Sequence, residues 1–131
     1  MIKKISLLVL FLGIFSSMYA LDLNKVSKDA LKNHKLILLS VESENCHYCK
    51  KMNKETFNPT KNHSKIVSQY IQKIVIKEDT KLPNNLKVKY FPTNYILDPK
   101  DMSIIEEFVG YMKADDFLSL LDIVYEQETT N

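Results

Sequence analysis

The stretch ENCHYCKK, residues 44–51, contains both cysteines of the 131-residue chain. His47 and Tyr48 separate Cys46 from Cys49, which gives the spacing Cys-x-x-Cys. Such a pair forms a redox-active dithiol, one half of a metal site, a haem attachment point or a structural disulfide. These four interpretations make different demands on the flanking residues, so the rest of the sequence discriminates among them.

Several of these interpretations disagree with the flanking sequence. Covalent haem attachment needs a histidine directly after the second cysteine, and this chain has Lys50 there. A structural zinc site has four ligands, and the sequence contains no second Cys-x-x-Cys pair. A structural disulfide stabilises a fold by closing a long loop, and a two-residue spacer closes very little chain. The remaining rival to a redox pair is a copper(I) site, in which His47 joins the thiolates of Cys46 and Cys49.

The first 20 residues have the pattern of a secretory signal peptide. Lys3 and Lys4 precede an apolar run at residues 5–15, and Ala20 offers a small residue for cleavage. Met18 departs from this pattern, because a small side chain is usual at the third position before the cut, so an uncleaved membrane anchor is the alternative. In both cases the sequence predicts export, and we expect residues 21–131 to form one compact domain.

The charge of the chain argues against a nucleic-acid partner. All 18 basic residues are lysines, and two of them lie in the leader, which leaves 16 against 16 acidic residues. These lysines are spread among the acids along the whole chain. A protein that tracks a phosphate backbone needs a basic patch or stripe, and the sequence does not provide one.

The cysteines lie where a predicted strand is followed by a predicted helix. Residues 36–41, LILLSV, are a continuous run of strand length, typical of a strand buried on both faces. Beyond this run, apolar or small side chains recur at helical spacing, at Cys49, Met52 and Thr56. The free N–H groups of a first helical turn stabilise a thiolate. We therefore expect Cys46 to be the exposed attacking sulfur, Cys49 the more buried resolving sulfur, and His47 a residue that tunes the dithiol.

The remaining segments predict an α/β fold. We expect a helix at residues 24–33 and another after Pro59, whose apolar face consists of Ile66, Val67, Tyr70 and Ile71. Strands are expected at 74–76, 94–97 and 103–109, and an amphipathic helix at about 113–126. The short turn at 98–101 makes the last two strands antiparallel. The sequence thus predicts a mixed central sheet of about four strands with helices on both faces.

With these segments in place, the chain resembles the thioredoxin-like superfamily, specifically its small exported thiol-disulfide oxidoreductases. The resemblance covers roughly residues 36–125 and has three marks: the strand–CHYC–helix unit, the segment VKYFPT at 88–93 before a strand, and VGY at 109–111 before the last helix. It implies a thioredoxin-like fold and a cis peptide bond between Phe91 and Pro92. It also implies that the backbone of Phe91, Pro92 and Thr93 binds an extended substrate segment by strand addition.

The sequence departs from the family pattern at several positions. Ser40 stands where many thioredoxins have a buried aspartate, and Asn45 stands where they have a tryptophan. Glu42 shares a strand face with Ser40 and is the candidate to replace that aspartate in deprotonating Cys49, but we expect a solvated side chain at this strand end. Phe91 is larger than the residue that commonly precedes the cis-proline. The dithiol chemistry does not depend on these positions, but they affect the reduction potential of the pair, which the sequence therefore does not predict.

The resulting hypothesis is a periplasmic enzyme that exchanges disulfides with exported proteins. Cys46 and Cys49 are its catalytic residues, His47 and Tyr48 flank and tune them, and the Cys46–Cys49 disulfide replaces any cofactor or metal. We favour a reductase because the resemblance is closest to the thioredoxin branch. A disulfide-donating oxidase of the same fold, a copper(I)-delivery module and a scaffold that only binds a partner are the alternatives. We expect a monomer, with exported thiol or disulfide proteins and a membrane electron donor or acceptor as partners.

Overall fold

The structure is a computed structural model, and it describes residues 21–130. Four α-helices and four strands follow one another in the order α1, β1, α2, α3, β2, β3, β4, α4. Their bounds are α1 Leu23–Lys32, β1 Leu36–Glu42, α2 His47–Met52, α3 Thr60–Gln69, β2 Tyr70–Ile76, β3 Thr93–Leu97, β4 Ile104–Val109 and α4 Ala114–Thr129. Two short helical segments of other types are also present. The π-helix η1, Asn53–Phe57, follows α2, and the 3-10 helix η2, Lys77–Asp79, follows β2. The expected signal peptide, residues 1–20, lies outside the described residues.

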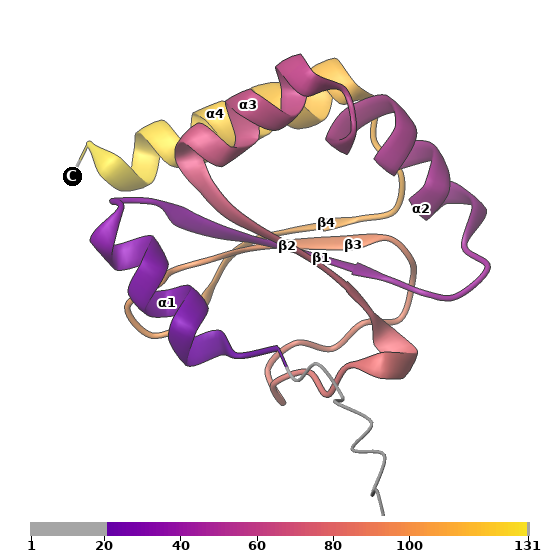
Figure 1. The fold of residues 1–131 in the computed structure, drawn as a ribbon, viewed down its shortest axis with the longest axis horizontal. Coiled ribbons are helices and arrows are strands. Elements are labelled where there is room, and N and C mark those ends of the chain that lie inside the picture. The colour runs from indigo at the N-terminus through magenta and orange to yellow at the C-terminus, as the bar shows by residue number, and fades with distance from the viewer. Residues whose placement is uncertain (1–20, 131) are drawn as a thin grey trace, which may run out of the picture.

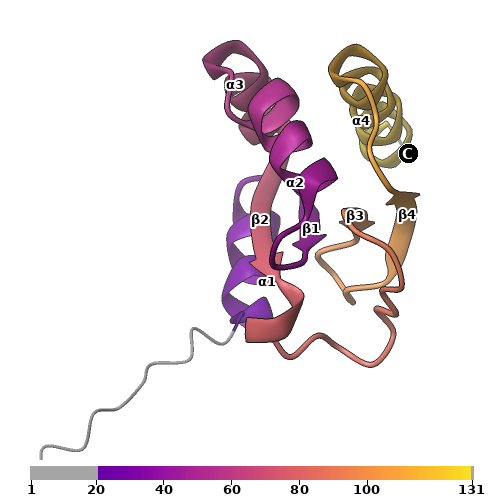
Figure 2. The same cartoon turned by 90° about the vertical axis from the view of Figure 1, so that its right-hand side faces the viewer.

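The four strands form one mixed sheet in the order β2-β1-β3-β4. Strand β1 pairs in parallel with β2, from Leu36 opposite Tyr70 to Glu42 opposite Ile76. It pairs antiparallel with β3 on its other side, and β3 pairs antiparallel with β4. The antiparallel hairpin predicted for the last two strands is present, and the parallel β1–β2 pair makes the sheet mixed, as expected. Figure 2 shows the four strands side by side in this order.

Helices cover both faces of the sheet, as expected. Helix α1 lies on one face, and α2, α3 and α4 lie on the other (Figure 1). Two hydrophobic cores lie on the two faces of the sheet, and β1 contributes side chains to both. Leu36 and Leu38 pack among α3 and α4 residues such as Ile66 and Phe117, whereas the odd-numbered residues Ile37, Leu39 and Val41 pack against Val26 and Ala30 of α1. This alternation explains why β1 is apolar except at Ser40 and Glu42, because every residue of β1 is buried on one face or the other. The fold prediction is confirmed.

The predicted boundary between the helix after Pro59 and the following strand is wrong, and the strand expected at 74–76 begins at Tyr70. The helix after Pro59 ends at Gln69, so Tyr70 and Ile71 belong to β2 and not to the apolar face of α3. The physical reason is pairing, because Tyr70 lies opposite Leu36 at the start of the parallel ladder. The Tyr70 side chain is fully buried, and its hydroxyl donates to the Leu121 carbonyl of α4 at 2.5 Å. Tertiary contacts therefore override the helical periodicity of this segment.

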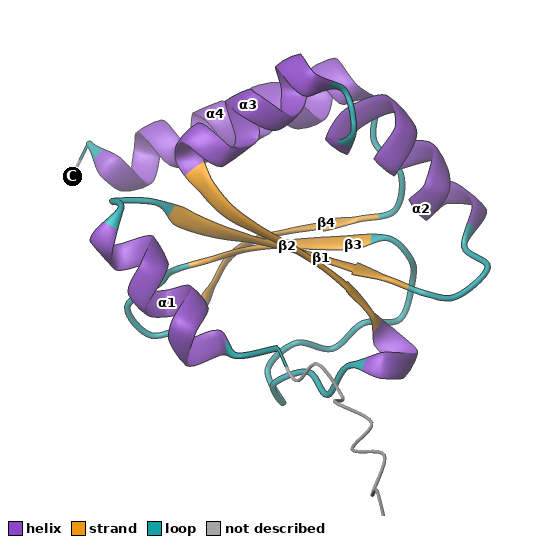
Figure 3. Cartoon of the chain, viewed as in Figure 1, coloured by secondary structure: helices purple, strands orange, loops and turns teal. Residues whose placement is uncertain are grey.

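The loops that carry chemistry gather at one end of the sheet. Figure 3 shows in teal the connections that leave the ends of β1 and β4 and enter β3 at this end. Among residues 21–130 no helix is long and apolar enough to cross a membrane.

Candidate active site

The register of the sheet places three segments of the site next to one another. Val41, Thr93 and Val109 form one row across β1, β3 and β4. The residues just beyond this row are therefore neighbours at the same sheet end: Glu42 leads to the cysteines, Pro92 precedes β3, and Gly110 follows β4. Neighbouring strands lie about 4.8 Å apart. Residues 42 and 92, which are 50 positions apart in the sequence, are brought together in this way.

Cys46 caps the start of α2. Its Sγ accepts a hydrogen bond from the Cys49 N–H at 3.2 Å, and its carbonyl accepts from the Lys50 N–H at 3.2 Å. The two cysteines form a disulfide, with their Cα atoms 5.3 Å apart. Cys46 is partly exposed, whereas Cys49 is 2% exposed. An N–H that points at Sγ favours the charged form of the Cys46 sulfur once the disulfide is reduced.

The loop before Cys46 is anchored by a carboxylate from another element. Glu78 of η2 accepts hydrogen bonds from the Ser43 hydroxyl and from the Glu44 N–H, the latter at 3.2 Å. The hydrogen bond from Ser43 holds the pKa of the Glu78 carboxyl below its ordinary value. Asn45, the last residue before Cys46, has left-handed backbone with φ of 55°, a region that asparagine adopts more readily than most residues. Together these features fix the path of the chain into α2.

The segment before β3 is held by two hydrogen bonds. The Phe91–Pro92 peptide bond is cis. The Thr93 hydroxyl donates to the Tyr90 carbonyl at 2.7 Å, and the Pro92 carbonyl accepts from the Gly110 N–H at 2.7 Å. Pro92 and Thr93 are buried, and Phe91 is partly exposed. The assignment of a substrate-binding role to Phe91, Pro92 and Thr93 stays a prediction.

A buried polar pair lies under α2. The Ser40 hydroxyl donates to Asn94 Oδ1 at 2.5 Å, and the Asn94 amide donates to Met52 Sδ at 3.7 Å. All three side chains are buried. Met52 follows Cys49 by one helical turn, so this chain of contacts supports the inner face of the dithiol helix. The position of the family's buried aspartate is therefore occupied by a neutral hydrogen-bonded pair.

The expectation that Glu42 is solvated is wrong. The residue is only 7% exposed, and it lies on the same face of β1 as Ser40, the face that α2 covers. Strand β1 continues through Glu42, which pairs with Ile76 of β2, and this pairing draws the residue into the sheet.

The two residues between the cysteines both lie at the surface. His47 and Tyr48 are exposed, and their rings meet edge to face with centroids 5.6 Å apart. Tyr48 also contacts Tyr111, with centroids 6.3 Å apart. The tuning role of His47 and Tyr48 stays a prediction. No group of three or more histidine, cysteine or acidic residues within residues 21–130 is placed to hold a metal ion.

Sequence reasoning missed Tyr111 as a residue of the site. Its hydroxyl donates to the Glu55 carboxylate of η1, and the Lys51 ammonium lies 4.4 Å from the centre of its ring. The hydrogen bond to Glu55 raises the pKa of the Tyr111 phenol. The sequence identifies the VGY segment at 109–111 only as a family mark before the last helix. Glu55 is 56 residues away in the sequence, and no local pattern signals their contact.

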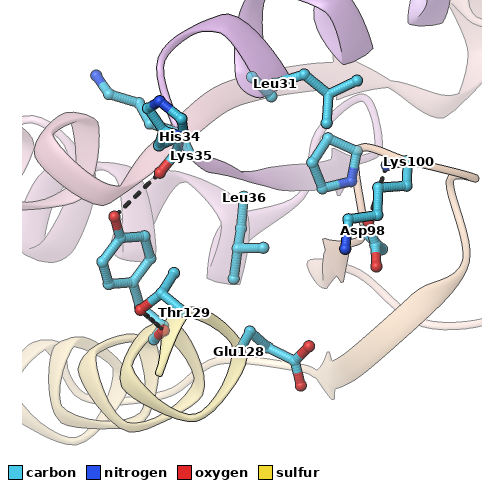
Figure 4. A pocket seen from close by; sticks show the side chains of 11 residues that line it. Leu31, His34, Lys35, Leu36, Asp98, Lys100, Glu128 and Thr129 are labelled. Carbon is cyan, nitrogen blue, oxygen red and sulfur yellow. Dashed lines mark hydrogen bonds between the residues drawn. The ribbon is translucent and has the colours of Figure 1, made fainter. Parts of the chain in front are cut away.

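A pocket of about 320 Å³ lies at the opposite end of the sheet from the cysteines. Figure 4 shows Leu36, the first residue of β1, in the centre of the pocket. Around it lie Leu31 of α1, Glu128 of α4 and Lys100 from the turn between β3 and β4. The Tyr125 hydroxyl donates to the His34 carbonyl at 3.1 Å on one side of this pocket. None of the predicted site residues lines it.

Comparison with solved structures gives the same fold. A thioredoxin from Thermus thermophilus aligns with a TM-score of 0.63 and 19% identity, over 76% of this chain and 81% of that one. The reduced C-terminal domain of Neisseria meningitidis DsbD aligns with a TM-score of 0.56 and 24% identity, over 77% and 92%. The periplasmic thioredoxin SoxS from Paracoccus pantotrophus aligns with a TM-score of 0.52 and 20% identity, over 72% and 99%. No curated protein sequence matches the chain.

The family follows from the sequence match. The thioredoxin-like domain family matches residues 23–125, from the start of α1 to near the end of α4. This span includes the whole sheet and both cysteines. The chain therefore belongs to the thioredoxin-like domain family, and with its Cys46–Cys49 pair it is a thiol-disulfide oxidoreductase.

Proposed function

We propose that the protein is exported and reduces disulfides in other exported proteins. The observation that supports this best is the asymmetry of the dithiol. Cys46 is partly exposed and its sulfur accepts an N–H bond at the start of α2, whereas Cys49 is buried behind it. A substrate disulfide reaches Cys46 first, and Cys49 is positioned to act only afterwards.

The reaction has two exchange steps. The Cys46 thiolate attacks one sulfur of the substrate disulfide, which forms a Cys46–substrate disulfide and releases the other substrate sulfur as a thiolate. The Cys49 thiolate then attacks Cys46 Sγ, which forms the Cys46–Cys49 disulfide and releases the second substrate thiol. The substrate gains two electrons and two protons, and the enzyme is oxidised. A second dithiol protein, supplied with electrons from the membrane, restores the reduced enzyme by the reverse exchange.

The substrate segment lies along Phe91, Pro92 and Thr93 in this proposal. An extended peptide adds to such a segment through main-chain hydrogen bonds, and nearby pockets select its side chains. Three exposed apolar side chains at the same sheet end support binding of a polypeptide: Tyr48 is 57% exposed, Tyr90 is 68% exposed and Val109 is 56% exposed. Exposed apolar groups of this size mark binding surfaces when they gather.

Export and direction are supported by separate observations. The apolar leader with Lys3 and Lys4 supports export, and one similar structure is described as a periplasmic thioredoxin. Two of the similar structures are thioredoxins, and this supports the reductive direction over donation of disulfides.

The reduction potential of the pair tests the direction. Residues 21–131 are equilibrated in glutathione buffers, and free thiols are counted by alkylation and mass. We expect a value below roughly −200 mV, near the about −270 mV of thioredoxin. A value near about −120 mV marks a disulfide donor and contradicts the reductase. A pair that never cycles contradicts the oxidoreductase mechanism as a whole.

The roles of the two cysteines are tested by matched serine variants. Cys46→Ser removes the attacking sulfur, so no covalent complex with substrate is expected. Cys49→Ser leaves the first step intact and blocks the second, so mixed disulfides with exported proteins are expected to accumulate on non-reducing gels. Equal trapping by both variants contradicts the assignment of Cys46 as the attacking sulfur.

A further inference from the structure

Tyr111 connects parts of the site that are distant in the sequence. It lies in the loop between β4 and α4, and its hydroxyl donates to Glu55 in η1. The same ring lies under the Lys51 ammonium, 4.4 Å from its centroid, and beside the Tyr48 ring at 6.3 Å. Tyr111 thus contacts the segment α2–η1 at three residues, one of which lies between the two cysteines.

The residue before Tyr111 makes the second connection. The Gly110 N–H donates to the Pro92 carbonyl at 2.7 Å. Gly110 has φ of 87° and nothing lies within 4 Å of a Cβ placed there, so the constraint at this position is the backbone conformation and not space. Two consecutive residues therefore contact two separate parts of the site: Gly110 contacts the Phe91–Pro92 segment, and Tyr111 contacts the helix that carries Tyr48.

We infer that Tyr111 is a positioning residue for polypeptide substrates: its hydroxyl bond to Glu55 ties together two segments, at Tyr48 and at Phe91–Pro92, that in this inference form the two walls of a substrate groove. The inference rests on the proposed function, since it assigns a role within the same site. Because both walls are tied to residues 110–111, their separation is set before a substrate arrives.

Such preorganisation favours one class of substrate over another. A polypeptide contacts both walls, so any freedom between them must be lost on binding, and this loss weakens the encounter. A small disulfide contacts the sulfur atoms and hardly touches the walls. Loss of the tie is therefore expected to slow exchange with a protein disulfide and to leave exchange with a small disulfide unchanged.

The test uses Tyr111→Phe, which deletes the hydroxyl and keeps the ring over Lys51 and beside Tyr48. The matched control is Tyr125→Phe, which deletes a hydroxyl bonded to a backbone carbonyl at the far end of the sheet. Each reduced protein is mixed with insulin or with 2-hydroxyethyl disulfide, quenched by alkylation and weighed. We expect Tyr111→Phe to lower the insulin rate constant about two- to tenfold, the range for one lost hydrogen bond, with the small-disulfide rate unchanged. Tyr125→Phe should match the wild type in both reactions.

Two further measurements separate the outcomes. Glu55→Ala should slow the insulin reaction as Tyr111→Phe does, and the double variant should be no slower than either single one, because both remove the same bond. Amide hydrogen exchange at residues 53–57 should become faster in Tyr111→Phe and stay unchanged in Tyr125→Phe, a readout that needs no activity.

The inference is overturned if Tyr111→Phe and Tyr125→Phe react with insulin at the same rate. It is also overturned if Tyr111→Phe slows the reactions with insulin and with 2-hydroxyethyl disulfide by the same factor. The hydroxyl then acts on the dithiol chemistry and not on the groove. Wild-type protein that reacts with neither disulfide contradicts the proposed function instead. In that case the amide exchange at residues 53–57 still decides whether the hydroxyl holds the helix.

Discussion

The Ser40 hydroxyl donates a hydrogen bond to Asn94 Oδ1 at 2.5 Å, and both side chains are fully buried beneath the dithiol helix. The two residues lie directly opposite each other on β1 and β3. The Asn94 amide continues the contact to Met52. Buried polar groups are tolerated when each forms a hydrogen bond with another. If one partner is removed, the other stays buried without a hydrogen bond, and this lowers the free energy of unfolding.

Ser40→Ala is expected to destabilise the protein by about 1–3 kcal/mol, because it leaves Asn94 Oδ1 buried without its donor. The measurement is the free energy of unfolding from urea titration of residues 21–131. Ser119→Ala on the exposed side of α4 is the control, and surface changes of this kind stay within about 0.5 kcal/mol. If the two variants are equally stable, the Ser40–Asn94 bond does not contribute to folding.

Local patterns predicted the parts of this site that are contiguous in the sequence. The apolar run before the cysteines and the helical spacing after them place the dithiol at the start of α2, and the turn at 98–101 gives the β3–β4 hairpin. Contacts between segments that are distant in the sequence could not be predicted from local sequence patterns. The hydrogen bond from Tyr111 to Glu55, the burial of Glu42 and the strand pairing of Tyr70 each depend on which segments meet in three dimensions.

Glu78→Gln is expected to loosen the loop before Cys46, with an effect that depends on pH. The folded pKa of Glu78 lies below its unfolded value, so its contribution to stability is present above the unfolded pKa of about 4.3 and is lost as pH falls through the folded pKa. The melting temperatures of wild type and variant should therefore differ at pH 6 and converge toward pH 3. Glu44→Gln is the control, because only the backbone N–H of Glu44 takes part in this contact. A difference that stays constant across this range contradicts the assignment.

Tyr70→Phe is expected to flatten the loss of stability at high pH. Burial raises the pKa of Tyr70 in the folded protein, so this residue contributes stability that is fully present below the unfolded pKa of about 10 and is lost as pH rises above it. Above pH 10 each such tyrosine lowers the free energy of unfolding by about 1.4 kcal/mol per pH unit. Urea titrations at pH 8, 10 and 11 compare the wild type with Tyr70→Phe. Equal slopes in both proteins rule out Tyr70 as the titrating group.

His47→Ala tests whether the histidine between the cysteines tunes the dithiol. A cationic imidazole near Cys46 stabilises the thiolate, which belongs to the reduced form, and so raises the reduction potential. Its removal should lower the potential by on the order of 10 mV, since 30 mV corresponds to about 1.4 kcal/mol and exposed charges interact by less than that. His63→Ala, an exposed histidine on α3, is the control. Equal potentials for the two variants contradict a tuning role of His47 and leave the start of α2 as the group that stabilises the Cys46 thiolate.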